Sequence, residues 1–579
     1  MKKMICWLTL LCLLIVSVPA ALAEGGAHTV TGQDMDYRLG SDGDTLSGTV
    51  WFIDDSDVPY IALSYWPSVM DALVADPDDP EHVNGLAGMT FSMEGSAGRL
   101  TKTDGYYVEF DCDADVIRFL DYDGFIRSQS DNLLIDLASH QAADQDGSVQ
   151  YLYLDASSYE RYGKEAQIDA SAYGIDFIAN DGECYVPLQT LSDLMLSRRY
   201  SNALYNGEAV FIAPYGAFAD PDAPLAQEFY SVQPRDRSEA MARFSYAELC
   251  MALDTLYGLK GSHHIESFDT LADETGLKPA LTGTDPVEAD AALYQLLALH
   301  LGDRHSGFVS PSPLSDKDRL ATVEDGLGYS LASLASAEMR EIYENARSAF
   351  YPDDTVPAYE EISNTAYITF DQFISPSDDV DYYQTSPTAE AEDTYGLLLY
   401  AYQQITRDDS PIENVVLDMS LNRGGESNAA AFTLAAFLGT GAISTRDTFS
   451  GAMTTANYQA DMNLDGQIDE KDLGLKDKTL FCLESPCSFS CGNLVPCAFK
   501  ASNKVTLIGR TSGGGTCYVL PMSTADGSAF QMSGPLQMSF PKNGSFYDID
   551  QGAEPDVLLM KPASFYDRQA LTDYINSLR

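Results

Sequence analysis

Short stretches of alternating apolar and polar residues recur through the first 220 positions. Tyr106–Phe110 and Gln150–Leu154 both alternate in this way, and Gly-Asp and Asn-Gly pairs separate such runs. A period of two places alternate side chains in a core and in solvent. The pattern predicts a β-rich region over residues 28–222.

This region contains a weak internal repeat. Pro59–Met70 aligns with Tyr185–Met195, and each unit has the pattern of a strand that runs into a short amphipathic helix. The second unit resembles the small stalk domain at the N-terminus of copper amine oxidases, which carries no copper chemistry by itself. We therefore expect a β-rich module over 24–155 and a stalk-like α+β module over 156–222.

The pattern changes after the Pro-rich segment Asp220–Pro224. Apolar residues at helical spacing over 246–259 and 287–301 predict a helical subdomain, residues 225–320. Strands and helices then alternate, which predicts a mainly parallel sheet with right-handed crossovers over 355–579. The expected strands are 365–370, 414–418, 479–483 and 505–508, and the expected helices lie within 388–407, from about Ser427, and after Ser490. We expect an α/β fold in which residues from about 225 onward fold alone.

The first residues have the pattern of a signal peptide. Lys2 and Lys3 precede an apolar run from Ile5 to Val18, and Ala21–Ala23 supplies the small residues that a signal peptidase recognises. Residues 1–23 are thus predicted to be removed on export, which predicts a secreted or cell-surface protein. No later stretch is apolar and long enough to predict a membrane span.

The net charge excludes some classes of function, and the cysteine content bears on possible disulfides. The chain has 87 acidic and 34 basic residues, a net charge of −53, which excludes nucleic-acid phosphate binding as a main role and argues against docking on anionic lipid. Of the ten cysteines, Cys6 and Cys12 lie in the predicted signal peptide. Export permits disulfides among the other eight, but their connectivity cannot be deduced from sequence.

Three segments carry candidate chemistry: Leu301–Phe308 (LGDRHSGF), Val415–Gly425 (VVLDMSLNRGG) and Ser488–Val495 (SFSCGNLV). In the third, Ser490 stands at an expected strand-to-helix turn, where free N–H groups favour negative charge. The N–H of the next residue, Cys491, and one from the Gly-Gly turn of the second segment would bind an oxyanion. A serine hydroxyl also needs a base, and His is the side chain best suited near neutral pH.

The order of these motifs, followed by Ile508–Gly515 (IGRTSGGG), resembles the C-terminal-processing (tail-specific) serine peptidase family over roughly residues 240–579. The resemblance implies a ClpP/crotonase-like αββ core and peptide-bond hydrolysis. One branch of the family uses a Ser–Lys dyad, but residues 505–530 contain no Lys. The branch that resembles the tricorn protease core pairs Ser with His.

Carried onto this chain, the resemblance implies Ser490 as nucleophile, His305 as base, and Gly425 and Cys491 as oxyanion donors. The tricorn-type charge relay has a Ser just before its His, where this chain has Arg304. The resemblance places an acid near a C-terminal Gly-x-x-Pro-Asp, which leaves Asp550 and Glu554 as alternatives. With His305 as base, peptidase activity is expected to rise as the pH increases through the range in which an ordinary histidine, with a pKa of about 6.5, loses its proton.

Alternatives stay open for several of these residues. His305 alone also fits a solvated histidine at a helix end, and Ser488 is an alternative nucleophile. The whole domain also fits a catalytically inactive binding module, as in retinoid-binding proteins of this fold.

Residues 461–472 fit a calcium-binding loop inserted in the predicted core. Asp461, Asn463, Asp465, the carbonyl of Gln467, Asp469 and Asp472 would be the ligands, around a Gly at position six. An Asp at the last position resembles dockerin loops. The alternative is an acidic surface turn. The loop predicts structural calcium, while catalysis needs no cofactor.

Together these patterns predict an exported serine endopeptidase that acts on a peptide or protein substrate. The runner-up is a catalytically inactive peptide- or ligand-binding protein at the cell surface. For the N-terminal modules, contact with the cell envelope, gating of the site and a spacer role are all open.

Overall fold

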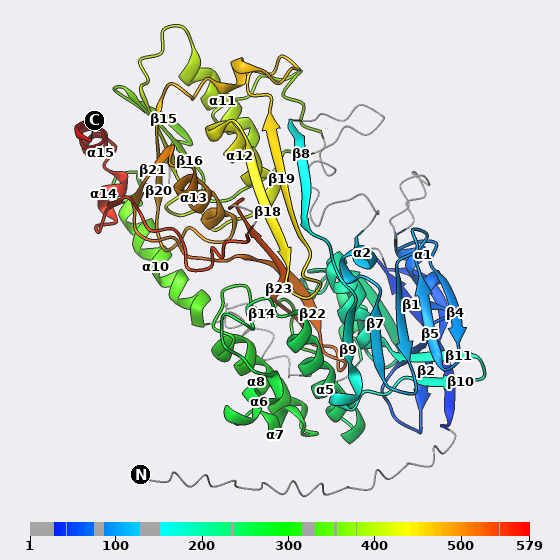
Figure 1. The fold of residues 1–579 in the computed structure, drawn as a ribbon. Coiled ribbons are helices and arrows are strands. Elements are labelled where there is room, and N and C mark those ends of the chain that lie inside the picture. The colour runs from blue at the N-terminus through cyan, green and yellow to red at the C-terminus, as the bar shows by residue number, and fades with distance from the viewer. Residues whose placement is uncertain are drawn as a thin grey trace, which may run out of the picture.

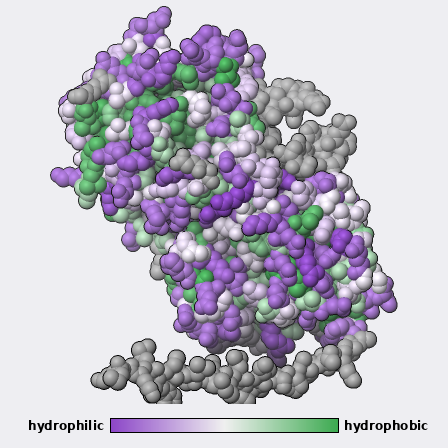
Figure 2. All heavy atoms as spheres, viewed as in Figure 1, coloured by the Kyte–Doolittle hydropathy of each residue, from purple (hydrophilic) through white to green (hydrophobic). Residues whose placement is uncertain are grey.

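The computed structural model describes residues 28–41, 43–74, 86–127, 151–232, 237–314, 331–352, 356–377, 379–542 and 545–578 (Figure 1). In these ranges the chain forms four β-sheets. The predicted signal peptide, residues 1–23, lies outside them. None of the helices within these ranges has both the length and the apolar character of a membrane span. Hydrophilic residues cover most of the face seen in Figure 2, with hydrophobic residues in smaller groups between them.

The N-terminal region is β-rich, as predicted. A seven-stranded sheet has the order β10 (Ile178–Asn180), β11 (Glu183–Pro187), β3 (Tyr60–Ala62), β2 (Asp44–Ile53), β1 (Val30–Leu39), β13 (Ala209–Pro214) and β12 (Ser201–Tyr205). A five-stranded sheet has the order β4 (Thr90–Glu94), β5 (Ala97–Thr101), β6 (Tyr107–Asp111), β7 (Val116–Phe119) and β9 (Ala166–Asp169). Both sheets combine strands from before residue 155 with strands from after residue 156.

The two units of the internal repeat are both strands that lead into helices. β3 precedes α1 (Trp66–Val74), and β11 precedes α3 (Leu188–Leu191). The two strands pair with each other antiparallel, with Ile61 opposite Val186. The repeat is therefore confirmed as a strand-to-helix unit, while the likeness to a stalk domain stays a prediction. Shorter helices in this half are α2 (Tyr122–Ile126), η1 (Ala170–Tyr173), η2 (Ser192–Leu196) and η3 (Ser197–Arg199).

A helical region follows, as predicted. It consists of α4 (Pro224–Tyr230), α5 (Glu239–Leu256), α6 (Phe268–Glu274), α7 (Lys278–Leu281), α8 (Pro286–Gln295) and η4 (Leu296–His300). Helices α5 and α8 each begin after a residue whose side chain accepts backbone N–H bonds. Ser238 caps α5, and Asp285 caps α8 just before a proline. Helix α10 (Leu331–Ser348) leads into the C-terminal sheet.

The predicted parallel sheet is confirmed. Its order is β15 (Tyr359–Ile362), β16 (Thr365–Thr369), β17 (Asn414–Asp418), β20 (Thr479–Glu484), β21 (Val505–Gly509) and β24 (Val557–Leu558), and all neighbours from β16 onward are parallel. The expected helices are α11 (Thr394–Thr406), α12 (Ser427–Leu438) and α13 (Cys491–Ser502). The short helices η7 (Glu470–Leu473), α14 (Ala563–Tyr566) and α15 (Arg568–Ser577) complete this part.

Both faces of this sheet are buried. Val415 and Leu417 pack in one core with side chains of α11, α12 and α13, whereas Val416 packs in another with α10, α14 and α15. A strand covered on both sides needs apolar residues at successive positions, which is why β17 is a continuous apolar run rather than an alternating one.

The remaining sheet joins distant parts of the chain. Its order is β14 (Gly307–Phe308), β23 (Ala529–Ser539), β18 (Gly441–Asp447), β19 (Met453–Ala460) and β8 (Leu152–Arg161), and β22 (Cys517–Ser523) also pairs with β23. β8 comes from the N-terminal half, and the predicted module boundary between residues 155 and 156 falls inside it. This strand lies beside β19 in Figure 1.

Buried polar contacts also cross between the halves of the chain. Arg198 lies 2.7 Å from Asp447, and neither side chain is more than 9% exposed. The amide of Gln189 donates to the carbonyl and the hydroxyl of Ser523. The expectation that residues from about 225 onward fold alone stays a prediction, and these contacts argue against it, because that fragment would lose β8 and these partners.

Candidate active site

Ser490 occupies a strained turn between β20 and α13. It is the residue before the helix, with φ +56° and ψ −124°. A non-glycine residue adopts such a conformation only when its surroundings enforce it, and such strain concentrates at functional sites. The Ser490 N–H donates to the carbonyl of Gly514 at 2.9 Å, and the Gly492 N–H donates to that of Phe489 at 2.8 Å. The turn thus presents the Ser490 hydroxyl at the N-terminus of α13, as in a nucleophile elbow.

The two serines of the segment have different environments. Ser488 is fully buried, and its hydroxyl donates to the carbonyl of Met419 at 2.7 Å and accepts the N–H of Ser485. The Ser490 hydroxyl has no hydrogen-bond partner in the described ranges of the chain. Of the two candidates, Ser490 is the one whose hydroxyl is free to react.

The Gly-Gly turn after β17 packs directly against Ser490. Gly424 and Gly425 have φ values of +99° and +129°, which favour glycine. A Cβ added at Gly424 would lie 2.8 Å from the Cβ of Ser490 and 3.2 Å from the N of Cys491. The N–H of Gly424 donates to the side chain of Asn422. Those of Gly425 and Cys491 have no acceptor among the described residues, so both are available to a ligand.

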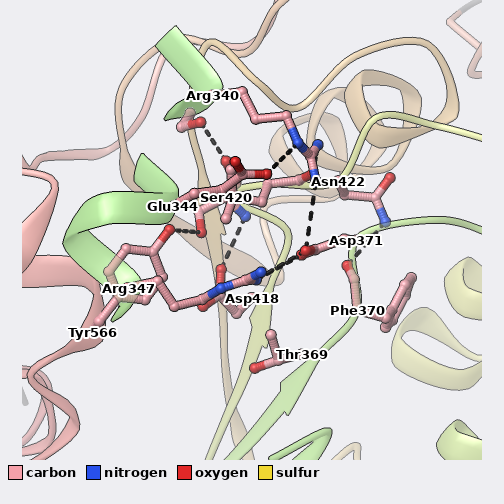
Figure 3. A network of polar contacts seen from close by, with 12 residues as sticks. Arg340, Glu344, Arg347, Thr369, Phe370, Asp371, Asp418, Ser420, Asn422 and Tyr566 are labelled. Atoms are coloured by element: carbon pink, nitrogen blue, oxygen red, sulfur yellow. Dashed lines mark hydrogen bonds and ion pairs between the residues drawn. The ribbon is translucent and has the colours of Figure 1, made fainter. Parts of the chain in front are cut away.

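A polar network holds the Gly-Gly turn in place (Figure 3). The side chain of Asn422 donates to the carbonyl of Phe370 at 3.1 Å, and Arg340 donates to that of Leu421 at 2.8 Å. Asp371 accepts two bonds from Arg347, at 2.9 and 3.1 Å. The contacts of Asn422 and Arg340 bind backbone carbonyls near the turn, so the free N–H groups are held before any ligand arrives.

His305 is buried rather than solvated. It is 8% exposed, and its ring lies 4.8 Å from that of Phe489, the residue before Ser490. Its backbone N–H donates to the carboxylate of Asp303 at 2.8 Å, and its carbonyl accepts from Gln531 at 2.6 Å. This placement does not fit the alternative of a solvated histidine at a helix end.

No hydrogen bond joins the Ser490 hydroxyl and the His305 ring in the described part of the chain. Catalytic contacts are often loose without substrate, so the structure leaves this pairing as a prediction. The ring Nδ1 of His305 instead lies 3.4 Å from the hydroxyl of Ser533. That hydroxyl donates to Asp303 at 3.1 Å, which also accepts from Tyr257 at 2.7 Å.

Ser533 and Asp303 were not among the residues predicted from sequence. Asp303 had a visible signal, because it stands two residues before His305 in the same motif, where a carboxylate readily accepts the N–H groups that follow it. Ser533 had none, because it comes from the middle of β23, more than 200 positions away. These side chains together orient the His305 ring.

The two acids suggested by the resemblance lie elsewhere. Asp550 accepts the N–H groups of Gly515 and Thr516, at 3.1 and 3.3 Å, and so orders the Gly-rich turn whose Gly514 carbonyl binds Ser490. Glu554 is exposed. Neither contacts His305 within the described ranges, and their catalytic roles stay predictions.

Burial dominates the electrostatics of the histidine. Desolvation lowers the pKa of His305 to about 4; Asp303 opposes this shift, and Arg304 adds to it. The Arg304 guanidinium lies 3.7 Å from the centre of the Phe489 ring. Burial, with Asp303 next, also holds the pKa of Tyr257 well above its usual range, so this phenol stays a donor. At neutral pH the imidazole is uncharged and able to accept a proton.

Comparison with known proteins adds an independent observation. Residues 364–559 match the model of peptidase family S41. The chain thus carries a serine-type peptidase domain. The S41 domain includes β16 to β24, the Gly-Gly turn and Ser490, whereas His305 precedes it.

No curated protein matches the chain. Among solved structures, a putative peptidase from Parabacteroides merdae is 15% identical, with 58% of this chain and 96% of that one covered and a TM-score of 0.41. A lipoprotein from Streptococcus agalactiae is 14% identical, with 60% and 98% covered and a TM-score of 0.33. The photosystem II D1 C-terminal processing protease is 19% identical, with 34% and 42% covered and a TM-score of 0.25.

The calcium-like loop lies inside the S41 domain, between β19 and β20. Asp461 accepts the Gly466 N–H at 2.7 Å, and both oxygens of Asp472 accept backbone N–H groups. Asp465 accepts a bond from Lys471 at 2.8 Å. The carboxylates are thus bound to the loop itself, and no group of His, Cys, Asp or Glu among the described residues is arranged to hold a metal ion. Calcium binding, which would have to displace Lys471, stays a prediction.

Proposed function

We propose that this protein is an exported serine endopeptidase that cleaves peptide bonds in peptide or protein substrates. The observation that carries the proposal is the placement of Ser490. Its free hydroxyl stands at a strained turn, at a helix N-terminus, beside two unused N–H groups. The S41 domain supports the reaction class, and the sequence of residues 1–23 supports export.

In the proposed reaction, neutral His305 takes the proton of the Ser490 hydroxyl as its oxygen attacks the substrate carbonyl carbon. The carbonyl π electrons move to oxygen, and the N–H groups of Gly425 and Cys491 bind the resulting oxyanion. The oxyanion then collapses, the C–N bond breaks, and His305 gives its proton to the leaving amine. Water repeats the sequence on the acyl-enzyme and restores Ser490.

The side chains behind the histidine have positioning roles in this scheme. Ser533 and Asp303 hold the ring through Nδ1, which leaves Nε2 for the serine. The positive charge on His305 that arises during attack is stabilised by Asp303, in the manner of the acid in a serine-peptidase triad. This assignment uses His305 and requires no lysine.

One observation favours the alternative of a binding protein without catalysis, namely the missing hydrogen bond between Ser490 and His305. The two proposals differ in whether Ser490 reacts. Wild-type protein should cleave members of a broad peptide library and be labelled by a fluorophosphonate at Ser490. A protein that binds peptides but neither cleaves nor labels would establish the alternative.

Variants test the two roles separately. Ser490→Ala and His305→Ala should each reduce kcat by about 10⁴-fold or more, while the thermal melting midpoint of Ser490→Ala stays within a few degrees. His300→Ala, an exposed histidine at the end of η4, is the matched control and should cleave like wild type. Full activity in the His305 variant would remove His305 from the mechanism.

A further inference from the structure

The sulfur atoms of two cysteines lie in contact between the two N-terminal sheets. The Sγ atoms of Cys112 and Cys184 lie 3.3 Å apart, although the residues are 72 positions apart in sequence. Cys112 follows β6 of the five-stranded sheet, and Cys184 lies on β11 of the seven-stranded sheet. Among the described residues no other pair of cysteines is in sulfur–sulfur contact.

The surroundings hold these two sulfurs together. Cys184 is fully buried, and its carbonyl accepts the N–H of Leu63 at 2.9 Å; the N–H of Cys112 donates to Ser96 at 3.3 Å. Opposite them lies Gly98, on β5. A Cβ at Gly98 would stand 2.5 Å from the Cβ and 2.8 Å from the Sγ of Cys184. Only a glycine leaves room for this thiol, so the neighbouring strand is shaped to the cysteine pair.

We propose that Cys112 and Cys184 form a disulfide that crosslinks the two N-terminal sheets once the chain meets a disulfide-exchanging oxidant. The expected export route supplies such an oxidant, since compartments outside the cytosol hold protein or glutathione disulfides. A disulfide has an S–S distance of about 2.05 Å, so the sulfurs need to approach by about 1.2 Å. This inference goes beyond the proposed peptidase: it rests on the export that the proposed function includes, but not on the peptidase reaction.

The chemistry determines which thiol reacts first. Cys112 is half-buried, so its thiolate attacks the oxidant and releases one thiol as a mixed disulfide forms. The hydrogen bond that Cys184 makes with Cys112, together with the burial of Cys184, holds the pKa of the Cys184 thiol well above its usual range. Cys184 therefore acts second: its sulfur gives up a proton and displaces the oxidant's remaining thiol. Two electrons and two protons pass to the oxidant, which leaves as two thiols.

Peptide mapping of wild-type protein tests the bond without a mutation. The reduced full chain is incubated with oxidised glutathione, denatured, blocked at its free thiols and digested with trypsin. Cys112 and Cys184 are the single cysteines of the tryptic peptides 103–118 and 165–198. The proposal expects these two peptides to be linked, and to separate on reduction. Recovery of both as singly blocked peptides, or of either linked to another cysteine, would overturn it.

Melting curves give a second measurement that keeps the proposal testable if a variant folds poorly. Oxidation should raise the melting midpoint of wild type by about 5 °C, because the crosslink restricts the unfolded chain. Cys112→Ser should abolish that shift. Cys250→Ser, which removes a buried thiol in α5, should preserve it. A wild-type midpoint that does not change, or an equal shift in Cys112→Ser, would count against the crosslink.

Discussion

Lowering the pH from 7.5 to 5.5 separates the buried His305 from an ordinary histidine. An unperturbed imidazole, with a pKa of about 6.5, would be about 9% neutral at pH 5.5. With the pKa of His305 lowered to about 4, about 97% of the rings stay neutral at that pH. If the neutral ring is the base, kcat/KM should fall by less than about twofold, whereas an ordinary histidine would lose about tenfold.

The assay is the initial rate of cleavage of a fluorogenic peptide at substrate concentrations far below KM, from pH 3.5 to 8. Under that condition the profile reports groups of the free enzyme. Enzyme held at each pH and returned to pH 7.5 must regain its rate, which excludes acid unfolding. The activity should decline only near pH 4. An apparent pKa near 6.5 with a tenfold loss would refute the argument that burial sets the state of His305.

The pH dependence of folding stability provides a second measurement of the lowered pKa of His305. The pKa of His305 is lower in the folded than in the unfolded chain, so between pH 4 and 6.5 the unfolded chain binds more protons. The contribution of His305 to stability is therefore present above about pH 6.5 and is lost as the pH falls toward 4. At pH 4.5 the loss is about 2.5 kcal/mol. Urea unfolding should show it as a steeper acid loss in wild type than in His305→Gln; equal losses would contradict it.

Three further predictions concern the rest of the chain. A fragment of residues 225–579 lacks β8 and should be insoluble and inactive; a soluble, active fragment would show that the N-terminal half is dispensable. Arg198→Met leaves Asp447 buried without its cation and should lower the free energy of unfolding by about 3–5 kcal/mol in urea titrations, and a loss below 1 kcal/mol would be inconsistent with a buried pair. Calcium should raise the melting midpoint of wild type but not of Asp465→Ala if loop 461–472 binds it, and identical curves in calcium and chelator would remove the site.

Periodicity was enough to predict the parallel sheet. Residues 414–418 are a strand in both the prediction and the structure, and the helices expected from about Ser427 and after Ser490 begin at Ser427 and Cys491. These elements are apolar runs bounded by polar turns, and both faces of their sheet are buried. The core therefore dictates residue type at nearly every position, and the pattern is strong.

The place of β8 could not be predicted in the same way. All of its residues from Asp155 to Arg161 are exposed or half-buried, and its pairing partner, β19, lies about 300 positions later. A strand of this kind has a recognisable type but no local signal for the sheet it joins. The predicted boundary between residues 155 and 156 came from local patterns along the chain, whereas the sheet that β8 joins is determined by strand pairing.

The same difference between local sequence pattern and long-range strand pairing explains why the surroundings of His305 could not be predicted. β14 is only two residues long, and its antiparallel register with β23 places Gly307 opposite Gln531 and Phe308 opposite Phe530. Continuing that register by two residues sets His305 opposite Ser533, the hydroxyl that its ring contacts. A slip of one residue would put Met532 or Gly534 there, and neither has a side chain able to donate to Asp303. The position of the histidine therefore depends on the register of one short strand pair, which no motif around His305 encodes.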